Sequence, residues 1–163
     1  MKIAIGNDHR GVELKQKIIS RFKNNIFMDI GSSSKEGSVD YPDYAARVTK
    51  EIINKKCERG ILICGSGIGM SMSANKFPGI RAAMVWDPKI AELTRQHNDS
   101  NVLCLASDFT ETATIFDIVD VWLKTPFEGG RHQRRVEKMN EQEASWNISE
   151  KQTQKSRQPS RKN

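Results

Sequence analysis

The chain has 163 residues, of which 28% are charged and 37% hydrophobic, and its formal net charge is +6. This length and composition are typical of one folded domain and argue against general disorder. Apolar runs such as Ala82 to Trp86 are far shorter than the ~18 residues of a membrane-spanning helix, and the N-terminus becomes polar too early for a signal peptide, so we expect neither membrane spanning nor classical secretion.

Short apolar runs alternate along the chain with longer segments of helical periodicity. In chain order they predict strand 2–6, helix 12–22, strand 26–30, helix 44–53, strand 60–64, helix 70–76, strand 81–86, helix 89–97, strand 102–106 and helix 112–123. Strands and helices that alternate with short loops predict an α/β fold, in which a parallel sheet carries helices on both faces. Such sheets bind ligands at the carboxyl ends of their strands.

The C-terminal part of the chain has a different composition. Residues 131–144 predict a charged helix with few apolar side chains, which we expect to reach over a partner subunit. Residues 151–163 hold five basic and no acidic residues, whereas the rest of the chain carries 21 basic against 20 acidic ones. We therefore expect a folded domain over residues 1–145 and a basic, disordered tail over residues 146–163. No nucleic acid is expected on the nearly neutral body, and a weak contact of the tail with RNA or an anionic surface stays open.

The strongest local signal is the segment Cys64-Gly65-Ser66-Gly67-Ile68-Gly69, directly after the third predicted strand. Glycine lets the backbone approach a ligand, and the N–H groups at the start of a helix can hold a phosphate or a developing oxyanion. The same position favours the thiolate form of Cys64. The segment is neither a P-loop nor a dinucleotide fingerprint, and a glycine turn needed only for packing remains an alternative.

The chain has three cysteines, Cys57, Cys64 and Cys104, and no two of them have C-x-x-C spacing. An odd number without metal-ligand spacing predicts neither a disulfide framework nor a zinc site, and favours the reducing cytoplasm. Because neither a metal cluster nor a dinucleotide motif is present in the sequence, we expect no metal and no cofactor.

Asp8 and His9 follow the first predicted strand, at the sheet edge that also holds Cys64. A helix N-cap with a surface histidine is the alternative interpretation. His97 precedes the fifth predicted strand, where a structural hydrogen-bonding role is the alternative to catalysis.

Arg131 and Arg135 share one face of the predicted C-terminal helix, because they are four residues apart. Two guanidinium groups on one face suit a phosphate dianion, with a solvated basic face as the alternative. Together with a thiolate, a histidine and oxyanion donors, these groups suit proton transfer beside the carbonyl of a phosphorylated sugar. A base would remove the proton next to the carbonyl and return it to the neighbouring carbon, while N–H groups stabilise the enediolate.

The sequence resembles the type B ribose-5-phosphate isomerases, which are grouped with the galactose-6-phosphate and allose-6-phosphate isomerases. The resemblance lies, in the expected order over residues 2–140, in Ile5 to His9, Asp40 to Pro42, Ile63 to Gly69, Ala74 to Lys76, Gly79 to Ala82, Arg95 to Asp99 and Gly130 to Arg135. It implies a Rossmann-like three-layer sandwich with a central five-stranded parallel sheet and a protruding C-terminal helix. It also implies a homodimer whose two active sites are each built from both subunits, and it leaves the pairing of dimers into tetramers open.

The resemblance further implies a role for each matching residue. Cys64 would be the proton-transferring base, and His97 would help to open the furanose ring, supported by Asp8. The residues that bind the substrate would be Gly65, Ser66, Gly67, Ile68 and Gly69 in the anion hole, with Ser66 assisting catalysis, Tyr41 and Asn98 at the sugar, and His9, Arg131 and Arg135 at the phosphate. Met70 stands where one branch of the family uses a glutamate in place of the cysteine, so this chain resembles the cysteine branch.

One position departs from the family pattern. Many members have an arginine after Gly-Ser at the end of the fifth strand, where it helps to bind phosphate, whereas this chain has Ala106-Ser107-Asp108. Asp108 either faces the pocket, which places an anion near the phosphate, or turns away and pairs with a neighbouring arginine.

The sequence therefore predicts an isomerase that interconverts D-ribose 5-phosphate and D-ribulose 5-phosphate in the pentose phosphate pathway through a Cys-catalysed enediolate mechanism. The same chemistry on a six-carbon sugar phosphate, such as allose 6-phosphate or galactose 6-phosphate, remains an alternative. Two other classes also stay open: a non-catalytic phosphosugar-binding protein, and a nucleic-acid binder that acts through the tail.

Overall fold

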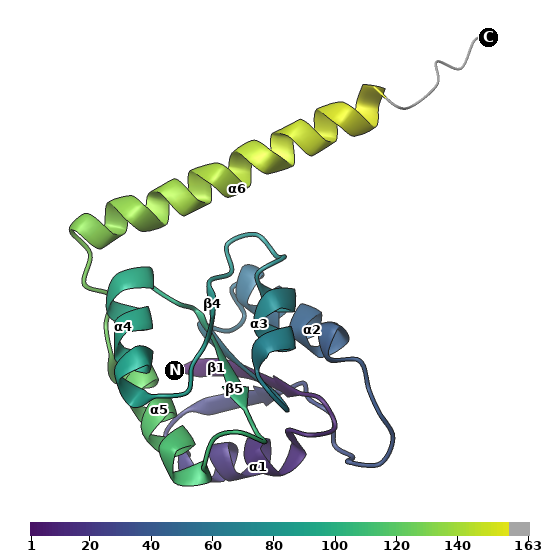
Figure 1. The fold of residues 1–163 in the computed structure, drawn as a ribbon, viewed down its shortest axis with the longest axis vertical. Helices are drawn as coiled ribbons and strands as arrows, with labels where there is room; N and C mark the ends of the chain where they lie inside the picture. The colour runs from purple at the N-terminus through teal and green to yellow at the C-terminus, as the bar shows by residue number, and fades with distance from the viewer. Residues whose placement is uncertain (157–163) are drawn as a thin grey trace.

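A parallel sheet of five strands forms the centre of the molecule (Figure 1). The structure, a computed structural model, describes the backbone of residues 1–156 and the side chains of residues 1–146. The strands are β1 (Lys2–Asn7), β2 (Ile26–Asp29), β3 (Arg59–Cys64), β4 (Ala82–Met84) and β5 (Val102–Ala106). Their spatial order is β2-β1-β3-β5-β4, and all four pairings are parallel. The predicted five-stranded parallel sheet is confirmed.

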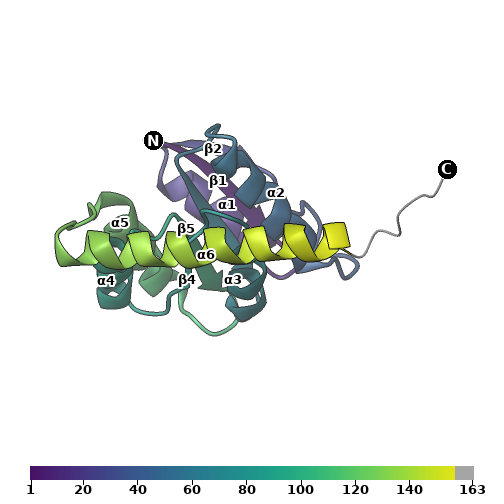
Figure 2. The same ribbon diagram turned by 90° about the horizontal axis from the view of Figure 1, so that it is seen from above.

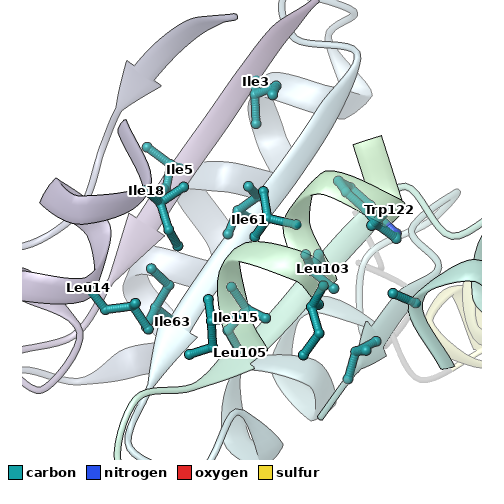
Figure 3. Close-up of a cluster of buried hydrophobic side chains, with 14 residues drawn as sticks. Ile3, Ile5, Leu14, Ile18, Ile61, Ile63, Leu103, Leu105, Ile115 and Trp122 are labelled. Atoms are coloured by element: carbon teal, nitrogen blue, oxygen red, sulfur yellow. The ribbon is translucent and has the colours of Figure 1, made fainter. Parts of the chain in front are cut away.

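Helices cover both faces of this sheet, which makes a three-layer α/β sandwich as predicted. The helices are α1 (Val12–Arg21), α2 (Tyr41–Ile53), α3 (Ile68–Ala74), α4 (Pro88–Asn98), α5 (Thr112–Lys124) and α6 (Arg131–Ser156). The side chains of α1, α4 and α5 form one apolar core with the sheet, and those of α2 and α3 form the other. Figure 3 shows the first core, in which Trp122 and several isoleucines and leucines are fully buried.

Alternation along the central strands decides which layer each side chain enters. Ile61 and Ile63 of β3 lie in the core under α1, α4 and α5, whereas Leu62 and Cys64 lie in the core under α2 and α3. Each fully buried isoleucine or leucine stabilises the fold by about 1.5–3 kcal/mol relative to an exposed one. Because of this period of two, Cys64 ends β3 with its side chain in the α2–α3 layer.

Among the helix boundaries that differ from the predictions are the starts of α2 and α3 and the end of α6. α2 begins at Tyr41 rather than residue 44, because Asp40 takes the N-cap position and Pro42 suits the first turn. α3 begins at Ile68, two residues early. α6 continues to Ser156 instead of ending at residue 144, so the backbone of residues 146–156 is helical rather than disordered. The sequence from residue 131 to 158 holds neither glycine nor proline and many good helix formers, which explains the extension.

The end of the predicted disordered tail, residues 157–163, lies outside the described residues. α6 protrudes from the body as predicted and runs across it when seen from above (Figure 2). It is held there by the buried side chain of Val136 and by Glu143, whose Oε2 accepts a hydrogen bond from the Gly79 N–H at 2.9 Å. Among the helices of the described part, none is both long enough and apolar enough to cross a membrane.

Candidate active site

Cys64 stands at the carboxyl end of β3, beside Ala106 of β5. Its side chain is only 5% exposed, and its Sγ accepts a hydrogen bond from the backbone N–H of Gly67 at 3.2 Å. Gly67 has a φ of +74°, a left-handed conformation that glycine adopts without steric cost. A backbone N–H that points at the sulfur is placed to interact with negative charge on it.

The predicted anion hole, Gly65 to Gly69, consists of the loop after Cys64 and the first two residues of α3. Ser66 is half-buried, and its Oγ accepts a hydrogen bond from the Ile68 N–H at 3.3 Å. Two N–H groups of this loop are therefore directed at Cys64 and Ser66. A cavity of about 310 Å³ opens beside the loop, lined in part by Ser66, Ile68 and Ala106.

Tyr41 lies directly against the same loop. A Cβ atom at Gly69 would stand 2.7–3.1 Å from the atoms of the Tyr41 ring, closer than real Cβ contacts. Glycine at position 69 thus makes room for the ring. Tyr41 is 40% exposed, so its ring is accessible to solvent while it contacts Gly69.

Asp8 and His9 follow β1 at this edge of the sheet, where the backbone N–H of Asp8 donates to the Ile63 carbonyl at 3.1 Å. Asp8 is buried, and its Oδ1 accepts from the N–H groups of Arg10 at 2.9 Å and Gly11 at 3.3 Å. Its carboxylate therefore shapes the start of α1. The Nδ1 atom of His9 accepts from the Val39 N–H at 3.3 Å, which leaves Nε2 as the nitrogen that can face a ligand.

Asp108 pairs with an arginine of its own chain and stays beside Gly65. Its Oδ2 lies 2.5 Å from both Nε and Nη2 of Arg10. The pair rests on Gly65, where an added Cβ would stand 2.7 Å from Asp108 Oδ2 and 2.9 Å from Arg10 Nε. An anion at position 108 is thus matched by a cation from the loop after β1.

The second set of predicted residues gathers where α4 ends and α6 begins. The rings of His97 and His132 stack with centroids 4.1 Å apart and an interplanar angle of 3°. Asn98, which ends α4, is exposed, as are Arg131 and Arg135 on the first turns of α6. The geometry therefore brings the predicted ring-opening histidine close to the first of the two predicted phosphate-binding arginines.

His132 is buried and links its neighbours. Its Nε2 accepts a hydrogen bond from Arg131 Nε at 3.2 Å. Burial, followed by the nearby His97 and Arg131, lowers the pKa of His132 below its ordinary value. A ring nitrogen that accepts from Arg131 is consistent with this direction, and Glu128 Oε2 lies 3.5 Å from the same Nε2.

His97, Glu128 and His132 place three possible metal ligands within 4.8 Å of one another. Arg131, however, already donates to the lone pair of His132 Nε2 and adds a positive charge beside it. A cation would have to displace this guanidinium. The geometry therefore favours a hydrogen-bonded cluster over a metal centre.

The two sets of residues lie at opposite edges of the sheet. Cys64 pairs with Ala106 at the end of β5, whereas His97 and Asn98 precede its start at Val102. β5 alone covers about 13 Å between these ends at ~3.3 Å per residue. In Figure 1, α6 lies beside the end of α4, and the arrow of β5 points away from it. One chain therefore does not bring Cys64 together with His97, Arg131 and Arg135.

Three residues at these places were missed by the sequence analysis. Arg10 has a partner 98 residues away, so no local pattern marks it. Glu128 and His132 are four residues apart around the start of α6, and His132 stands inside a motif that was noted for its arginines. The i, i+4 spacing of a carboxylate and a histidine was the one signal that would have found this pair.

Comparison with known proteins places the chain in a family. Residues 3–139 match the family model described as Ribose/Galactose Isomerase. The chain is 46% identical over 138 residues to the ribose-5-phosphate isomerase B of Escherichia coli, which covers 83% of this chain and 92% of the relative. It is 45% identical over 140 residues to a protein of Mycoplasma genitalium described as a probable ribose-5-phosphate isomerase B, over 84% of this chain and 92% of the relative.

Solved structures agree with this placement. Clostridium thermocellum ribose-5-phosphate isomerase B superimposes with a TM-score of 0.87 at 44% identity, over 90% of this chain and 99% of the other. The Mycoplasma genitalium enzyme with bound ribulose-5-phosphate superimposes with a TM-score of 0.84 at 43% identity, over 88% and 96%. Since the match covers nearly all of the folded body, the chain belongs to the ribose/galactose isomerase family.

Proposed function

We propose that this protein is an aldose–ketose isomerase that interconverts D-ribose 5-phosphate and D-ribulose 5-phosphate in the pentose phosphate pathway. The observation that carries the proposal is Cys64 at the carboxyl edge of the sheet, with the Gly67 N–H 3.2 Å from its sulfur. The family membership supports the same reaction, because relatives at about 45% identity bear the name ribose-5-phosphate isomerase B. One such relative was solved with ribulose-5-phosphate bound.

Cys64 acts as the base in this proposal. Its thiolate takes the proton from C2 of the open-chain aldose, and the electron pair moves to the C1 carbonyl, which forms an enediolate. Negative charge on the substrate oxygens is stabilised by N–H groups of the loop from Gly65 to Gly69, with the Ser66 hydroxyl assisting. A proton passes from the C2 hydroxyl to the C1 oxygen, the thiol returns its proton to C1, and the carbonyl forms at C2. The reaction therefore needs no external oxidant or reductant.

The remaining predicted residues hold the sugar in this scheme. His97 moves the proton that opens the furanose ring, and its 36% exposed side chain is accessible for that task. Tyr41 and Asn98 contact the sugar. His9, Arg131 and Arg135 hold the phosphate, for which guanidinium forks are suited. Asp8 supports the site mainly through the loop that it orders.

A homodimer with shared active sites is part of the proposal, because one chain holds its two half-sites at opposite edges of the sheet. A second copy supplies His97, Asn98, Arg131 and Arg135 to the Cys64 edge. Large apolar side chains are exposed next to this edge, namely Ile68 at 53%, Trp86 at 57% and Phe109 at 80%, and all three line the cavity beside Ser66. Exposed apolar patches of this kind mark interaction surfaces.

We also place the protein in the cytoplasm. All three cysteines, Cys57, Cys64 and Cys104, are free thiols. A catalytic thiolate requires a reducing compartment to stay reduced, which supports this location.

The proposal is tested by assaying the purified protein on ribose 5-phosphate, allose 6-phosphate and galactose 6-phosphate. We expect the highest kcat/KM with ribose 5-phosphate. Cys64→Ala should keep the fold, as seen by circular dichroism, and lose about 10²–10⁴-fold in kcat, the usual contribution of a positioned base. Cys57→Ala removes a buried thiol that lies outside the site. Its kcat should therefore stay within about threefold of the parent kcat, a difference below 1 kcal/mol in activation free energy.

Each other result has a definite meaning. Full activity of Cys64→Ala would remove this residue from the mechanism. A higher kcat/KM with a six-carbon sugar phosphate would assign the alternative substrate class. Tight binding of ribose 5-phosphate by calorimetry without turnover would show a phosphosugar-binding protein instead.

A further inference from the structure

The Arg10–Asp108 pair lies at the mouth of the Cys64 site, and the mechanism above does not use it. Both Nε and Nη2 of Arg10 are 2.5 Å from Asp108 Oδ2, and the two side chains are 56% and 27% exposed. Gly65, the residue next to Cys64, leaves the space that the pair fills, since a Cβ there would stand 2.7–3.1 Å from atoms of both side chains. The guanidinium is thus set beside the catalytic loop.

Three loops fix this position. The Asp108 N–H donates to the Gly65 carbonyl at 3.1 Å, and the Ser107 N–H donates to the Cys64 carbonyl at 2.9 Å. At the other partner, the Arg10 N–H donates to Asp8 Oδ1 at 2.9 Å. The loops after β1, β3 and β5 are therefore connected, and the guanidinium has a defined place relative to Cys64.

Stability alone is a weak reason for such a pair. An exposed ion pair contributes little net stability because solvent and salt screen it, and here it also requires a glycine at position 65. Asp108 Oδ2 uses only one edge of the guanidinium, which carries five N–H donors. The Arg10 side chain is 56% exposed, and a planar guanidinium fork matches phosphate oxygens.

We propose that Arg10 binds the phosphate of the sugar-phosphate substrate and that Asp108 is the positioning residue that holds its guanidinium at the Cys64 site. This inference rests on the proposed function and adds a specificity residue to it. The hydrogen bond and charge of Asp108 also raise the pKa of Arg10, so the guanidinium is charged at any physiological pH. The competing interpretation is a latch that only ties the loops together.

Steady-state kinetics separate the two interpretations. KM and kcat for ribose 5-phosphate, and the inhibition constant of inorganic phosphate, are measured for the parent, Arg10→Ala, Arg10→Lys and Asp108→Asn. Arg10→Ala should raise KM and the phosphate inhibition constant about tenfold or more, the effect of losing a charge-assisted hydrogen bond, with little change in kcat. Arg10→Lys should give a KM and a phosphate inhibition constant between those of the parent and of Arg10→Ala, because lysine keeps the positive charge and lacks the planar guanidinium fork.

Asp108→Asn keeps an acceptor oxygen for Arg10 and removes the negative charge that competes with phosphate. We therefore expect KM and the inhibition constant to stay equal or to fall. Lys124→Ala, which removes the cation of an exposed ion pair on α5, is the matched control and should change neither constant.

The proposal is overturned if Arg10→Ala leaves both constants unchanged. It is equally overturned if Asp108→Asn raises them as much as Arg10→Ala does, or if both variants lose kcat alone, which are the outcomes expected of a latch. A parent protein without turnover on any sugar phosphate would refute the proposed function instead. In that case, calorimetric titration of inorganic phosphate into the parent and Arg10→Ala still tests whether Arg10 binds phosphate.

Discussion

At the scale of single residues, the glycines after β3 meet three different needs. Gly65 leaves space for the Arg10–Asp108 pair, and Gly69 leaves space for the ring of Tyr41. Gly67 takes a φ of +74° and directs its N–H at Cys64 Sγ. Only the last need concerns the backbone conformation.

Gly67→Ala should cost about 1–2 kcal/mol of folding free energy, because a left-handed conformation places Cβ against the following carbonyl. An added Cβ would also stand 3.1 Å from the backbone of Leu105, so the turn must shift. We expect kcat to fall, with little change in KM, because the N–H moves away from the sulfur. Thermal unfolding and steady-state kinetics measure the two effects.

Gly79→Ala is the matched control, since Gly79 has a φ of +73° and no atom within 4 Å of the added Cβ. It should lower the melting temperature similarly and leave kcat unchanged. If Gly67→Ala kept the parent kcat while losing stability, the N–H of Gly67 would have no catalytic role.

At the scale of elements, the C-terminal end of α4 is held by a network of charges. Asp99 caps the helix with a φ of +47°, and its carboxylate binds Arg95 Nη1 at 2.8 Å and Arg81 Nη2 at 2.7 Å. Arg95 is buried and also donates to the Ser100 carbonyl at 2.6 Å. His97 lies inside this turn, so the network positions the predicted ring-opening residue.

Asp99→Ala should destabilise the protein by about 1–3 kcal/mol, because it leaves the charge of buried Arg95 without its carboxylate while Asp99 itself is partly exposed. We expect the last turn of α4 to loosen and kcat to fall as His97 loses its orientation. Chemical denaturation and the isomerase assay give the two readouts.

Asp120→Ala removes another i, i+4 ion pair, the exposed one with Lys124 on α5. It should change stability by less than about 0.5 kcal/mol and leave turnover intact. If Asp99→Ala and Asp120→Ala changed stability and turnover equally, the network at Asp99 would contribute no more than an ordinary surface ion pair.

At the scale of the whole molecule, the separation of the two proposed half-sites supports the proposal that two copies must associate for catalysis. Cys64 and His97 occupy opposite edges of the sheet, and α6 carries Arg131 and Arg135 along the His97 edge. With 26 residues, α6 is about 39 Å long and extends beyond its contact with α4. In a two-fold dimer, the Cys64 edge of each copy would face the His97 edge of its partner.

Two inactive variants should therefore complement each other. Cys64→Ala and His97→Ala are co-expressed with different tags, and the mixed oligomer is isolated by purification on both tags. It should show about half of the parent activity, because one of its two sites combines an intact Cys64 with an intact His97. An oligomer that carries both tags but recovers no activity, or a protein that stays monomeric at assay concentrations, would contradict shared sites.

The sequence alone was enough for the parallel sheet, for the loop after β3 and for the reaction class. The apolar runs of β3 after Arg59 and of β5, the helical periods between strands and the glycine-rich segment at Cys64 are local signals. Periodicity and backbone freedom depend on neighbouring residues. The same local signals predicted the start of α2 and the end of α6 wrongly. At these places N-capping and helix propensity set where the helix begins or ends.

Only the tertiary structure decided which polar residues meet. It paired Asp108 with Arg10, stacked His132 on His97, and placed the Cys64 and His97 groups at opposite edges of the sheet. These contacts join residues that are far apart in the chain or that lie at turns between elements. They follow from strand order and loop geometry, which no period in the sequence encodes, because a side chain's partner across a fold is set by how whole elements pack.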